Sequence, residues 1–227
     1  MFAHLRFWPD DTRRDGPLNM AIDETLLLTS TEPVLRVYRW AGPWVSFGCF
    51  VPCRDAQTAF PDRPLVRRWT GGGIVDHRAD WTYSLVIPGS HPLASRNTAG
   101  RYHDIHAALV TALSALHIQA TLAIAPPPGR GGQCFLQPVQ SDVVWAGKKI
   151  AGAAQRRTRH GLLHQGSVQG VPMPEGAIQS LATALCPSAR PSARPSACPS
   201  SDFADVLHAA AALARDKYAS PTWLEKL

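Results

Sequence analysis

Two stretches of the chain, about seventy residues apart, contain the residue types best suited to chemistry. The first runs from Arg67 to His77 and places three consecutive glycines, Gly71 to Gly73, behind two arginines. A glycine triplet beside strand-like sequence predicts a turn, or a place where a ligand meets bare backbone. Adjacent peptide N–H groups there can face a carboxylate, a phosphate or an oxyanion. An ordinary glycine-rich hairpin fits the same pattern, so the glycines alone leave both interpretations open.

The second stretch runs from Cys134 to Gln155 and contributes a thiol and a lysine, Lys149. Cys134 follows a segment rich in glycine and proline, whereas a core cysteine more often lies within a hydrophobic run. A thiol near the basic groups of these stretches would have a lowered pKa and could act as a nucleophile. Lys149 precedes small residues that leave room for a ligand, and a partly desolvated lysine can transfer protons or polarise a carbonyl. An inert cysteine and a lysine on a surface turn remain the alternatives.

The other polar residues fit the patterns of catalytic or metal-binding sites less well than Cys134 and Lys149 do. Four of them are expected to be structural hydrogen-bonding groups, because their spacing fits neither a metal site nor a serine triad: His77, Asp80, Asp142 and His164. Cys49 and Cys53 lie close in sequence, but no further His or Cys cluster completes a zinc site. We therefore expect no bound metal.

The bulk composition indicates a folded protein with one core, or one core and an appendage. The chain has 227 residues, of which 45% are hydrophobic. Its five cysteines are an odd number without framework spacing, so a disulfide scaffold is not expected. No apolar run is long enough to cross a bilayer, and the N-terminal segment lacks a signal peptide's apolar middle region, so we expect a cytoplasmic protein. The net charge of +6 suits a nucleic acid, an acidic protein partner or an anionic substrate equally.

Hydrophobic periodicity predicts many strands and few helices. Strands are expected at Leu5–Trp8, Val34–Trp40, Trp44–Gly48, Leu65–Arg68, Trp81–Ile87, Thr121–Ile124, Asp142–Trp145, Lys148–Arg157 and Gly161–Ser167. Helical spacing marks Gly16–Ser30 and Asn97–His117. The mixture predicts an α+β (mixed α/β) fold with a largely antiparallel central sheet flanked by helices.

Two local patterns sharpen this picture. The first helix contains Pro17 near its start, and we expect Asp23 and Glu24 to form its solvent-facing side. The Gly42-Pro43 pair predicts a hairpin between the two strands on either side of it.

A short Pro-Ser-Ala-Arg repeat divides the chain. Residues 186–201 cannot bury enough apolar surface to offset the cost of ordering, which predicts a disordered linker. Residues 1–185 before it form the main domain. Residues 202–227 after it contribute an alanine-rich helix that we expect to pack on that domain, with Asp202 as N-cap. Residues 125–133 predict a loop that leads into Cys134.

The order of the motifs resembles the lipoate and biotin protein ligase superfamily, in its lipoate ligase and octanoyltransferase branch. The resemblance covers most of Gly16–Ser167. It rests on LNMAIDETLL (Leu18–Leu27), RVYRWAGPWVSFGCF (Arg36–Phe50), RRWTGGGIVDH (Arg67–His77), DWTYSLVIP (Asp80–Pro88) and GKKIAGAAQRRTRHGLLHQGSV (Gly147–Val168). It implies that residues 1–185 adopt the superfamily's catalytic-domain fold. It also implies substrate-binding roles for Arg67, Arg68, Thr70, Gly71, Gly72, Gly73, His77, Gly152 and Ala153.

One class of octanoyltransferases in this branch carries a Cys-Phe-x-x-Pro motif shortly before the lysine motif, and Cys134–Pro138 fits it. The resemblance implies that Cys134 accepts octanoyl from an acyl-carrier protein as a thioester. Lys149 would assist proton transfer, and the acyl group would pass to a lysine of a lipoyl domain. A thiolate attacks a thioester readily, which divides the transfer into two easier steps without ATP. The glycine triplet would border the acyl chain or the oxyanion.

The resemblance also implies partners and leaves other activities open. The partners would be an acyl-carrier protein, the lipoyl domains of 2-oxoacid dehydrogenases or the glycine cleavage H protein, and an octanoate or lipoate moiety. No nucleic acid, membrane or cofactor is implied, and we expect a monomer. An ATP-dependent lipoate–protein ligase, using ATP and Mg, would instead hold an adenylate at Lys149 and the glycines. An amidotransferase would take octanoyl from another octanoylated carrier protein, and a binding module on this fold would hold acyl-lysine domains without turnover.

Overall fold

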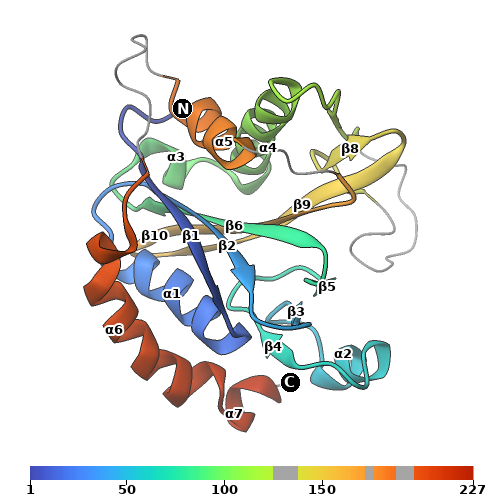
Figure 1. Cartoon of the computed structure of the whole chain (residues 1–227), viewed down its shortest axis with the longest axis vertical. Helices are drawn as coiled ribbons and strands as arrows, with labels where there is room; N and C mark the ends of the chain where they lie inside the picture. Colours follow the sequence, from blue (N-terminus) through green and yellow to red (C-terminus); the bar gives the residue numbers. More distant parts are fainter. Residues whose placement is uncertain (125–137, 172–175, 188–196, 227) are drawn as a thin grey trace.

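A computed structural model describes residues 1–124, 138–171, 176–187 and 197–226, and a large twisted sheet forms its middle layer (Figure 1). The strand order in this sheet is β1-β2-β6-β10-β9-β8-β7. The strands span Arg6–Arg14 (β1), Val34–Trp40 (β2), Asp80–Pro88 (β6), Gly161–Gln169 (β10), Lys148–Thr158 (β9), Val143–Trp145 (β8) and Thr121–Leu122 (β7). The β1–β2 pair is parallel and the other pairs are antiparallel, which confirms the predicted fold class.

A second, three-stranded sheet corrects the hairpin prediction. Its order is β4-β3-β5, formed by Leu65–Arg67, Val45–Phe47 and Ile74–Asp76. The predicted hairpin of β2 with β3 is wrong, because β3 pairs with β4 and β5 rather than with β2. After Trp40 the chain turns at Gly42, whose φ of +101° favours glycine, and leaves the large sheet.

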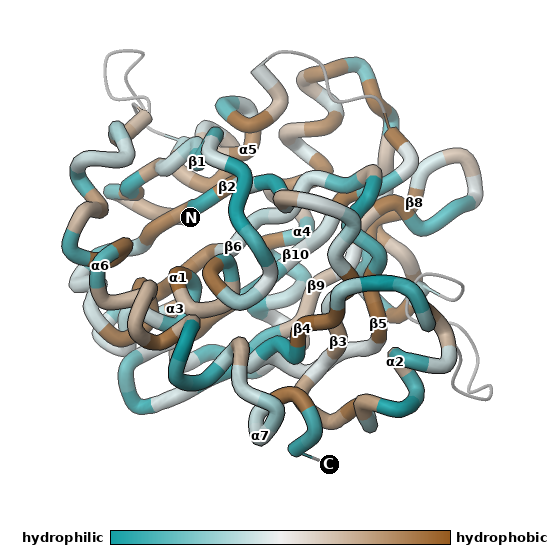
Figure 2. Tube along the Cα trace, turned by 60° about the horizontal axis from the view of Figure 1, so that its bottom comes forward, coloured by the Kyte–Doolittle hydropathy of each residue, from teal (hydrophilic) through white to brown (hydrophobic). Residues whose placement is uncertain are grey.

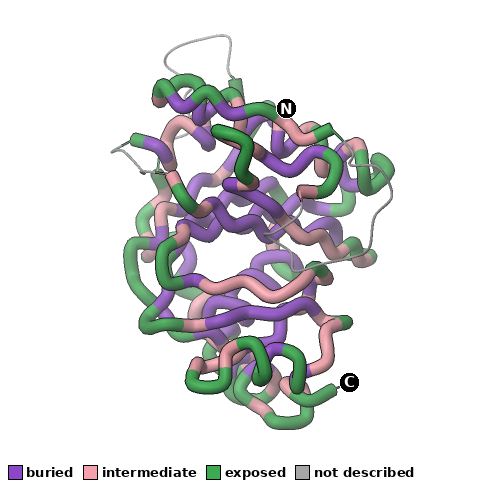
Figure 3. Tube along the Cα trace, turned by 90° about the vertical axis from the view of Figure 1, so that its right-hand side faces the viewer, coloured by how far each residue is buried: buried purple, intermediate pink, exposed green. Residues whose placement is uncertain are grey.

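Helices cover both faces of the large sheet (Figure 1). One face packs against α4 (Thr98–Ser114) and α5 (Ala177–Leu185), and the other packs against α1 (Gly16–Thr29) and α6 (Ala204–Leu213). The alternation of β2 divides its side chains between the two cores. Leu35 and Val37 belong to the α4–α5 core, and Val34 and Tyr38 belong to the α1–α6 core. The central strands are therefore mostly buried, as the purple segments in the middle of Figure 3 show. Figure 2 shows hydrophobic residues, in brown, along α1 and in the strands.

The expected solvent-facing side of α1 is buried, so that prediction is wrong. Asp23 is 0% exposed and Glu24 is 7% exposed. Arg36 of β2 donates to Asp23 over 2.9 Å, and Lys217 near the C-terminus donates to Glu24 over 2.6 Å. A buried carboxylate needs such a partner, and both partners come from segments distant in sequence.

The C-terminal segment wraps along α1 and reaches the small sheet. It consists of a 3₁₀ turn (η2, Ser200–Phe203), α6, a π-helical turn (η3, Ala214–Tyr218) and α7 (Pro221–Leu224). Both α6 and η3 contact α1, and α7 contacts β4. Asp202 is not the N-cap of α6, because it lies within the 3₁₀ turn and Phe203 occupies the cap position.

Most long elements match their predicted positions. The helix predicted at Asn97–His117 is α4, with the Asn97 side chain capping it, and the final meander is β8, β9 and β10. The short elements α2 (Cys53–Ala59), α3 (Pro92–Ser95) and β5, and also α5, were not predicted. No described helix is long and apolar enough to span a membrane.

Two histidines are enclosed in the α4–α5 side of the core. His106 and His164 are both 0% exposed. Burial lowers the pKa of His106 to about 4 and lowers the pKa of His164 well below its ordinary value. Both rings are therefore neutral in the folded protein near neutral pH.

These histidines predict a loss of stability on mild acidification. The unfolded chain binds protons at these rings below about pH 6.5, whereas the folded protein does not until about pH 4 at His106. The free energy of unfolding should therefore fall by about 1.4 kcal/mol per pH unit for each ring within this window. We expect the fall in the free energy of unfolding between pH 7.5 and pH 5.5 to be smaller by about 1.4 kcal/mol in a His106→Gln variant, measured by urea unfolding at pH 7.5, 6.5 and 5.5. Equal slopes in both proteins would contradict this account.

Candidate functional site

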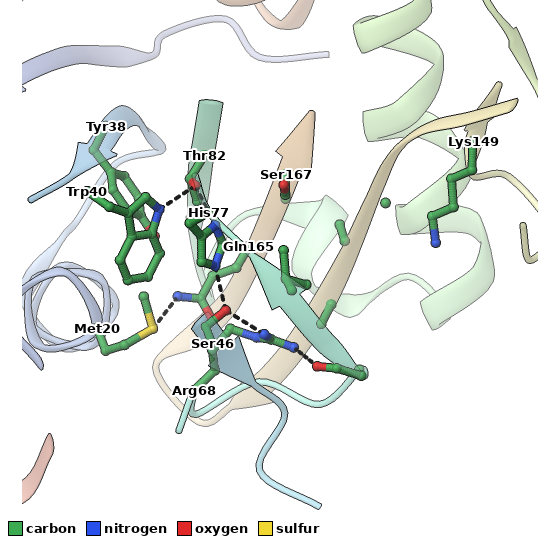
Figure 4. Close-up of a pocket in the computed structure, with 17 residues that line it drawn as sticks. Met20, Tyr38, Trp40, Ser46, Arg68, His77, Thr82, Lys149, Gln165 and Ser167 are labelled. Atoms are coloured by element: carbon green, nitrogen blue, oxygen red, sulfur yellow. Dashed lines mark hydrogen bonds between the residues drawn. The ribbon is translucent and has the colours of Figure 1, made fainter. Parts of the chain in front are cut away.

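A narrow cavity is lined by both sheets and by α1, and it collects most of the predicted site residues. Its walls come from α1, β2, β3, β5, β6, β9 and β10 and from the glycine loop between β4 and β5. Figure 4 shows Lys149 on one side of this cavity, with Met20, Tyr38 and Trp40 on the opposite side. The cavity therefore has two chemically different ends.

A buried ion pair forms the first end. The Lys149 ammonium lies 2.8 Å from the Asp142 carboxylate, and their side chains are 5% and 0% exposed. Gly152 makes room for this pair, because a Cβ there would lie 2.7 Å from Lys149 Cε and 2.8 Å from its Nζ. The glycine of the lysine motif thus allows the lysine to lie across its own strand.

Tyr102 of α4 fixes the carboxylate of this pair. Its hydroxyl donates to Asp142 Oδ1 over 2.6 Å and accepts from the Ala153 N–H over 2.9 Å. The Val139 N–H donates to the other carboxylate oxygen over 2.7 Å. Burial and the nearby Asp142 charge raise the pKa of Tyr102 well above its ordinary value, so the phenol remains a donor.

Aromatic and sulfur-containing side chains form the opposite end. The rings of Trp40 and His77 stack with centroids 4.0 Å apart, and the Trp40 indole N–H donates to Thr82 over 2.8 Å. Met20 and Tyr38 complete this end, and Tyr38 is 1% exposed. Such an end suits the apolar tail of a ligand.

Arg68 organises the glycine loop. Its guanidinium donates to the carbonyl oxygens of Gly71 and Gly73 over 3.0 and 2.9 Å. Gly72 has a φ of +83°, which favours glycine, and Gly72 and Gly73 line the cavity. The triplet is thus a turn that borders the cavity, while the role of its N–H groups toward an oxyanion stays a prediction.

The structure assembles a Ser–His–Asp chain that sequence spacing did not indicate. Ser46 Oγ lies 2.6 Å from His77 Nε2, and His77 Nδ1 lies 2.7 Å from Asp80 Oδ2. Arg68 also donates to Ser46 Oγ over 2.7 Å, and Ser167 donates to Asp80 over 2.6 Å. This chain ties β3 of the small sheet to β6 and β10 of the large one, and so fixes the His77 ring.

Thr70 and Arg67 support the cavity from behind. Thr70 is 0% exposed and donates to Gln165 Oε1 over 2.7 Å, and Gln165 donates to Asp23 over 2.7 Å. The Arg67 guanidinium donates to the backbone carbonyls of Leu224, Cys49 and Val51. Neither residue lines the cavity, so the geometry gives both a supporting position.

The predicted site residues therefore divide into three groups. The cavity brings together Arg68, Gly72, Gly73, His77, Lys149, Gly152 and Ala153. Arg67, Thr70 and Gly71 lie beside it but outside its lining. Cys134 lies outside the described residues.

Several cavity residues lie within the quoted motifs but were given no site role from the sequence. They include Met20, Tyr38, Trp40, Ser46, Thr82, Gln165 and Ser167. The alternation of β2 and β10 places Tyr38 with Trp40, and Gln165 with Ser167, on one face of a strand each. This alternation could be read from the sequence, but no local sequence pattern indicated that these faces border a cavity.

A protein family and several curated relatives match most of the chain. Residues 15–175 match the family described as lipoyl protein ligase A/B catalytic domain. Octanoyltransferase LipM from Oceanobacillus iheyensis is 38% identical over 168 residues, covering 70% of this chain and 62% of the relative. The same enzyme from Moorella thermoacetica is 35% identical over 166 residues, covering 68% and 61%. The chain thus spans about three fifths of the length of these curated relatives.

Solved structures share the fold at low identity. Lipoate-protein ligase A bound with ATP has a TM-score of 0.66 and 20% identity, covering 97% of this chain and 98% of that one. LipL1 of P. falciparum in complex with lipoate has a TM-score of 0.69 and 13% identity, covering 99% and 74%. At such identities the likeness concerns the fold. The match over residues 15–175 shows that the chain belongs to the lipoyl protein ligase A/B catalytic-domain family.

Proposed function

We propose that the chain is an octanoyltransferase that moves octanoyl from an acyl-carrier protein to a lysine of a lipoyl domain through a Cys134 thioester. The observation that carries this proposal is the asymmetry of the cavity. A buried lysine paired with Asp142 lies at one end, and Tyr38 and Trp40 close the other. An acyl chain matches this asymmetry, because its carbonyl needs a donor and its tail needs an apolar wall.

The chemistry follows from this orientation. The Cys134 thiolate attacks the carbonyl of the octanoyl thioester, and the carrier thiol leaves as the C–S bond breaks. We expect the Lys149 ammonium, which is buried beside Asp142, to donate a hydrogen bond to the oxyanion that develops on the carbonyl and a proton to the departing thiolate. The acceptor amine then attacks the Cys134 thioester, the C–S bond breaks and the Cys134 thiolate leaves, and the proton that the amine loses replaces the one that Lys149 gave to the carrier thiol. The exchange balances without ATP, so we propose that no nucleotide is consumed.

The relatives support the same direction. Those with the quoted identities are named octanoyltransferase, and the Cys134–Pro138 motif accords with a thioester route. The net charge of +6 suits acidic carrier proteins as donor and acceptor. The acyl-carrier protein, the lipoyl domains of 2-oxoacid dehydrogenases and the H protein are our proposed partners.

The proposal predicts an octanoyl adduct on Cys134 that needs no ATP. We expect incubation with octanoyl-carrier protein to add one octanoyl group by mass spectrometry, and a Cys134→Ser variant to show none. An adduct on Cys134 should then disappear when an unmodified lipoyl domain is added.

Each rival activity gives a different result. Lipoylation only with ATP would replace the proposal with a ligase. An adduct formed solely from an octanoylated lipoyl protein would indicate an amidotransferase. Neither acylation nor transfer, from a protein that still binds octanoyl-lysine domains, would indicate a binding module.

The Lys149–Asp142 pair predicts a selective loss of turnover. Asp142→Asn keeps the shape of the side chain but removes the negative charge that holds the Lys149 ammonium. We therefore expect kcat to fall about 10–100-fold, with KM for the octanoyl donor nearly unchanged. Lys149→Met should lower kcat about 10²–10³-fold. Asp104→Asn is the matched control: Asp104 lies on α4 and pairs with the exposed Arg96 just before this helix, so its loss should leave both constants unchanged. A rise in KM without a fall in kcat would contradict the assigned role.

A further inference from the structure

A second cavity shares the wall residue Ala153 with the acyl cavity. It has a volume of about 630 Å³ and lies between the start of α4 and residues 139–141. Ala153 lines both cavities, and Tyr102 and Ser141 of the second cavity flank the Asp142 carboxylate. The second cavity therefore lies next to the acyl cavity at Ala153, and its Tyr102 wall contacts the carboxylate that pairs with Lys149. Below, the second cavity is called the α4 groove.

The edge of β9 forms one wall of the α4 groove. Strand β8 pairs with β9 only as far as Ala151, so the edge of β9 beyond that residue faces the groove among the described residues. The Ala153 N–H points from this edge to the Tyr102 hydroxyl. In a strand the N–H and C=O of one residue point to the same side, so the Ala153 carbonyl lies on this edge too. A ligand with amide groups would find a backbone acceptor there.

The opposite wall combines small and apolar surface. Ala99 and Gly100 lie in the first turn of α4 and leave the groove open, and Val139, which also lines it, is 58% exposed. The first N–H groups of α4 do not make an anion site here, because the Asn97 side chain caps the Gly100 N–H over 2.7 Å. The wall therefore favours a neutral, partly apolar ligand over a phosphate or a nucleotide.

The direction of the acyl chain determines what enters this space. The carbonyl carbon of a thioester is trigonal planar, so its bonds to the acyl chain and to the thiol sulfur point in different directions. With the tail against Trp40 and the carbonyl at Lys149, the thiol side extends away from the acyl cavity, and the α4 groove lies beyond the shared Ala153. A pantetheine arm carries two amides and a branched apolar segment, which fits the Ala153 edge and Val139.

We propose that the α4 groove binds the pantetheine arm of the octanoyl donor. This inference rests on the proposed octanoyl transfer, and it assigns the thiol half of the substrate to Ala99, Val139 and the Ala153 edge of β9. The arm enters along the groove, its amide donates to the Ala153 carbonyl, and its sulfur reaches the Lys149 end. The groove thereby distinguishes carrier-borne donors from short thioesters.

The test compares three octanoyl donors that differ in the length of the thiol: N-acetylcysteamine, pantetheine and the carrier protein. We expect kcat/KM of the unaltered protein to rise from the first donor to the second. Ala99→Trp fills the groove from an exposed helical position. We expect it to lower kcat/KM about tenfold for the pantetheine and carrier-protein donors and to leave kcat/KM for the N-acetylcysteamine donor nearly unchanged. Ser114→Trp, exposed at the other end of α4, is the matched bulky control.

Other outcomes overturn the inference in distinguishable ways. Equal losses with all three donors would show a general defect, and no loss with any donor would show that the groove is unused. A loss with the carrier protein alone would indicate a protein-docking surface. A rise in KM for the acceptor alone would assign the groove to the incoming lysine. If the unaltered protein formed no octanoyl adduct from any donor, octanoyl transfer itself would fail instead.

Discussion

Arg36 carries its guanidinium charge into a part of the core that has no exposed surface, and two carboxylates neutralise it there. Nη1 donates to Asp23 over 2.9 Å, and Nε and Nη2 donate to Asp10 over 2.9 and 2.8 Å. Removing one partner of a buried pair typically costs about 3–5 kcal/mol, because the other charge is left uncompensated. This cluster therefore fixes α1 against the parallel pair β1 and β2, and the rest of the site is built on that frame.

The cluster extends from the core to the cavity through Asp23. Its carboxylate also accepts from Tyr38 and Gln165, and Gln165 accepts in turn from Thr70. One end of the cavity is thus fixed by a buried charge on the α1 face. The Lys149–Asp142 pair fixes the other end, and Tyr102 anchors it from α4 on the opposite face. Two buried ion pairs therefore determine the length and the polarity of the binding space.

The sequence predicted what local patterns determine. Strand patterns located β2 and the final meander, and helical spacing located α4. Partners distant in the chain decided the rest. Asp23 was placed toward solvent because Arg36 could not be foreseen beside it, and the Arg67 donors turned toward the Leu224 carbonyl, 157 residues away. The order of the motifs identified the glycine loop and Lys149 as parts of one site, which no single residue could do. The other walls of the cavity are formed by tertiary packing and could not be predicted from local sequence.

The orientation of the acyl chain is the central claim, and a crystal structure with bound octanoate tests it most directly. The account predicts electron density in the cavity with the carboxylate within hydrogen-bond distance of Lys149 Nζ and the terminal methyl group against Tyr38 and Trp40. A carboxylate bound at His77 with the methyl group toward Lys149, or octanoate outside this cavity, would contradict it.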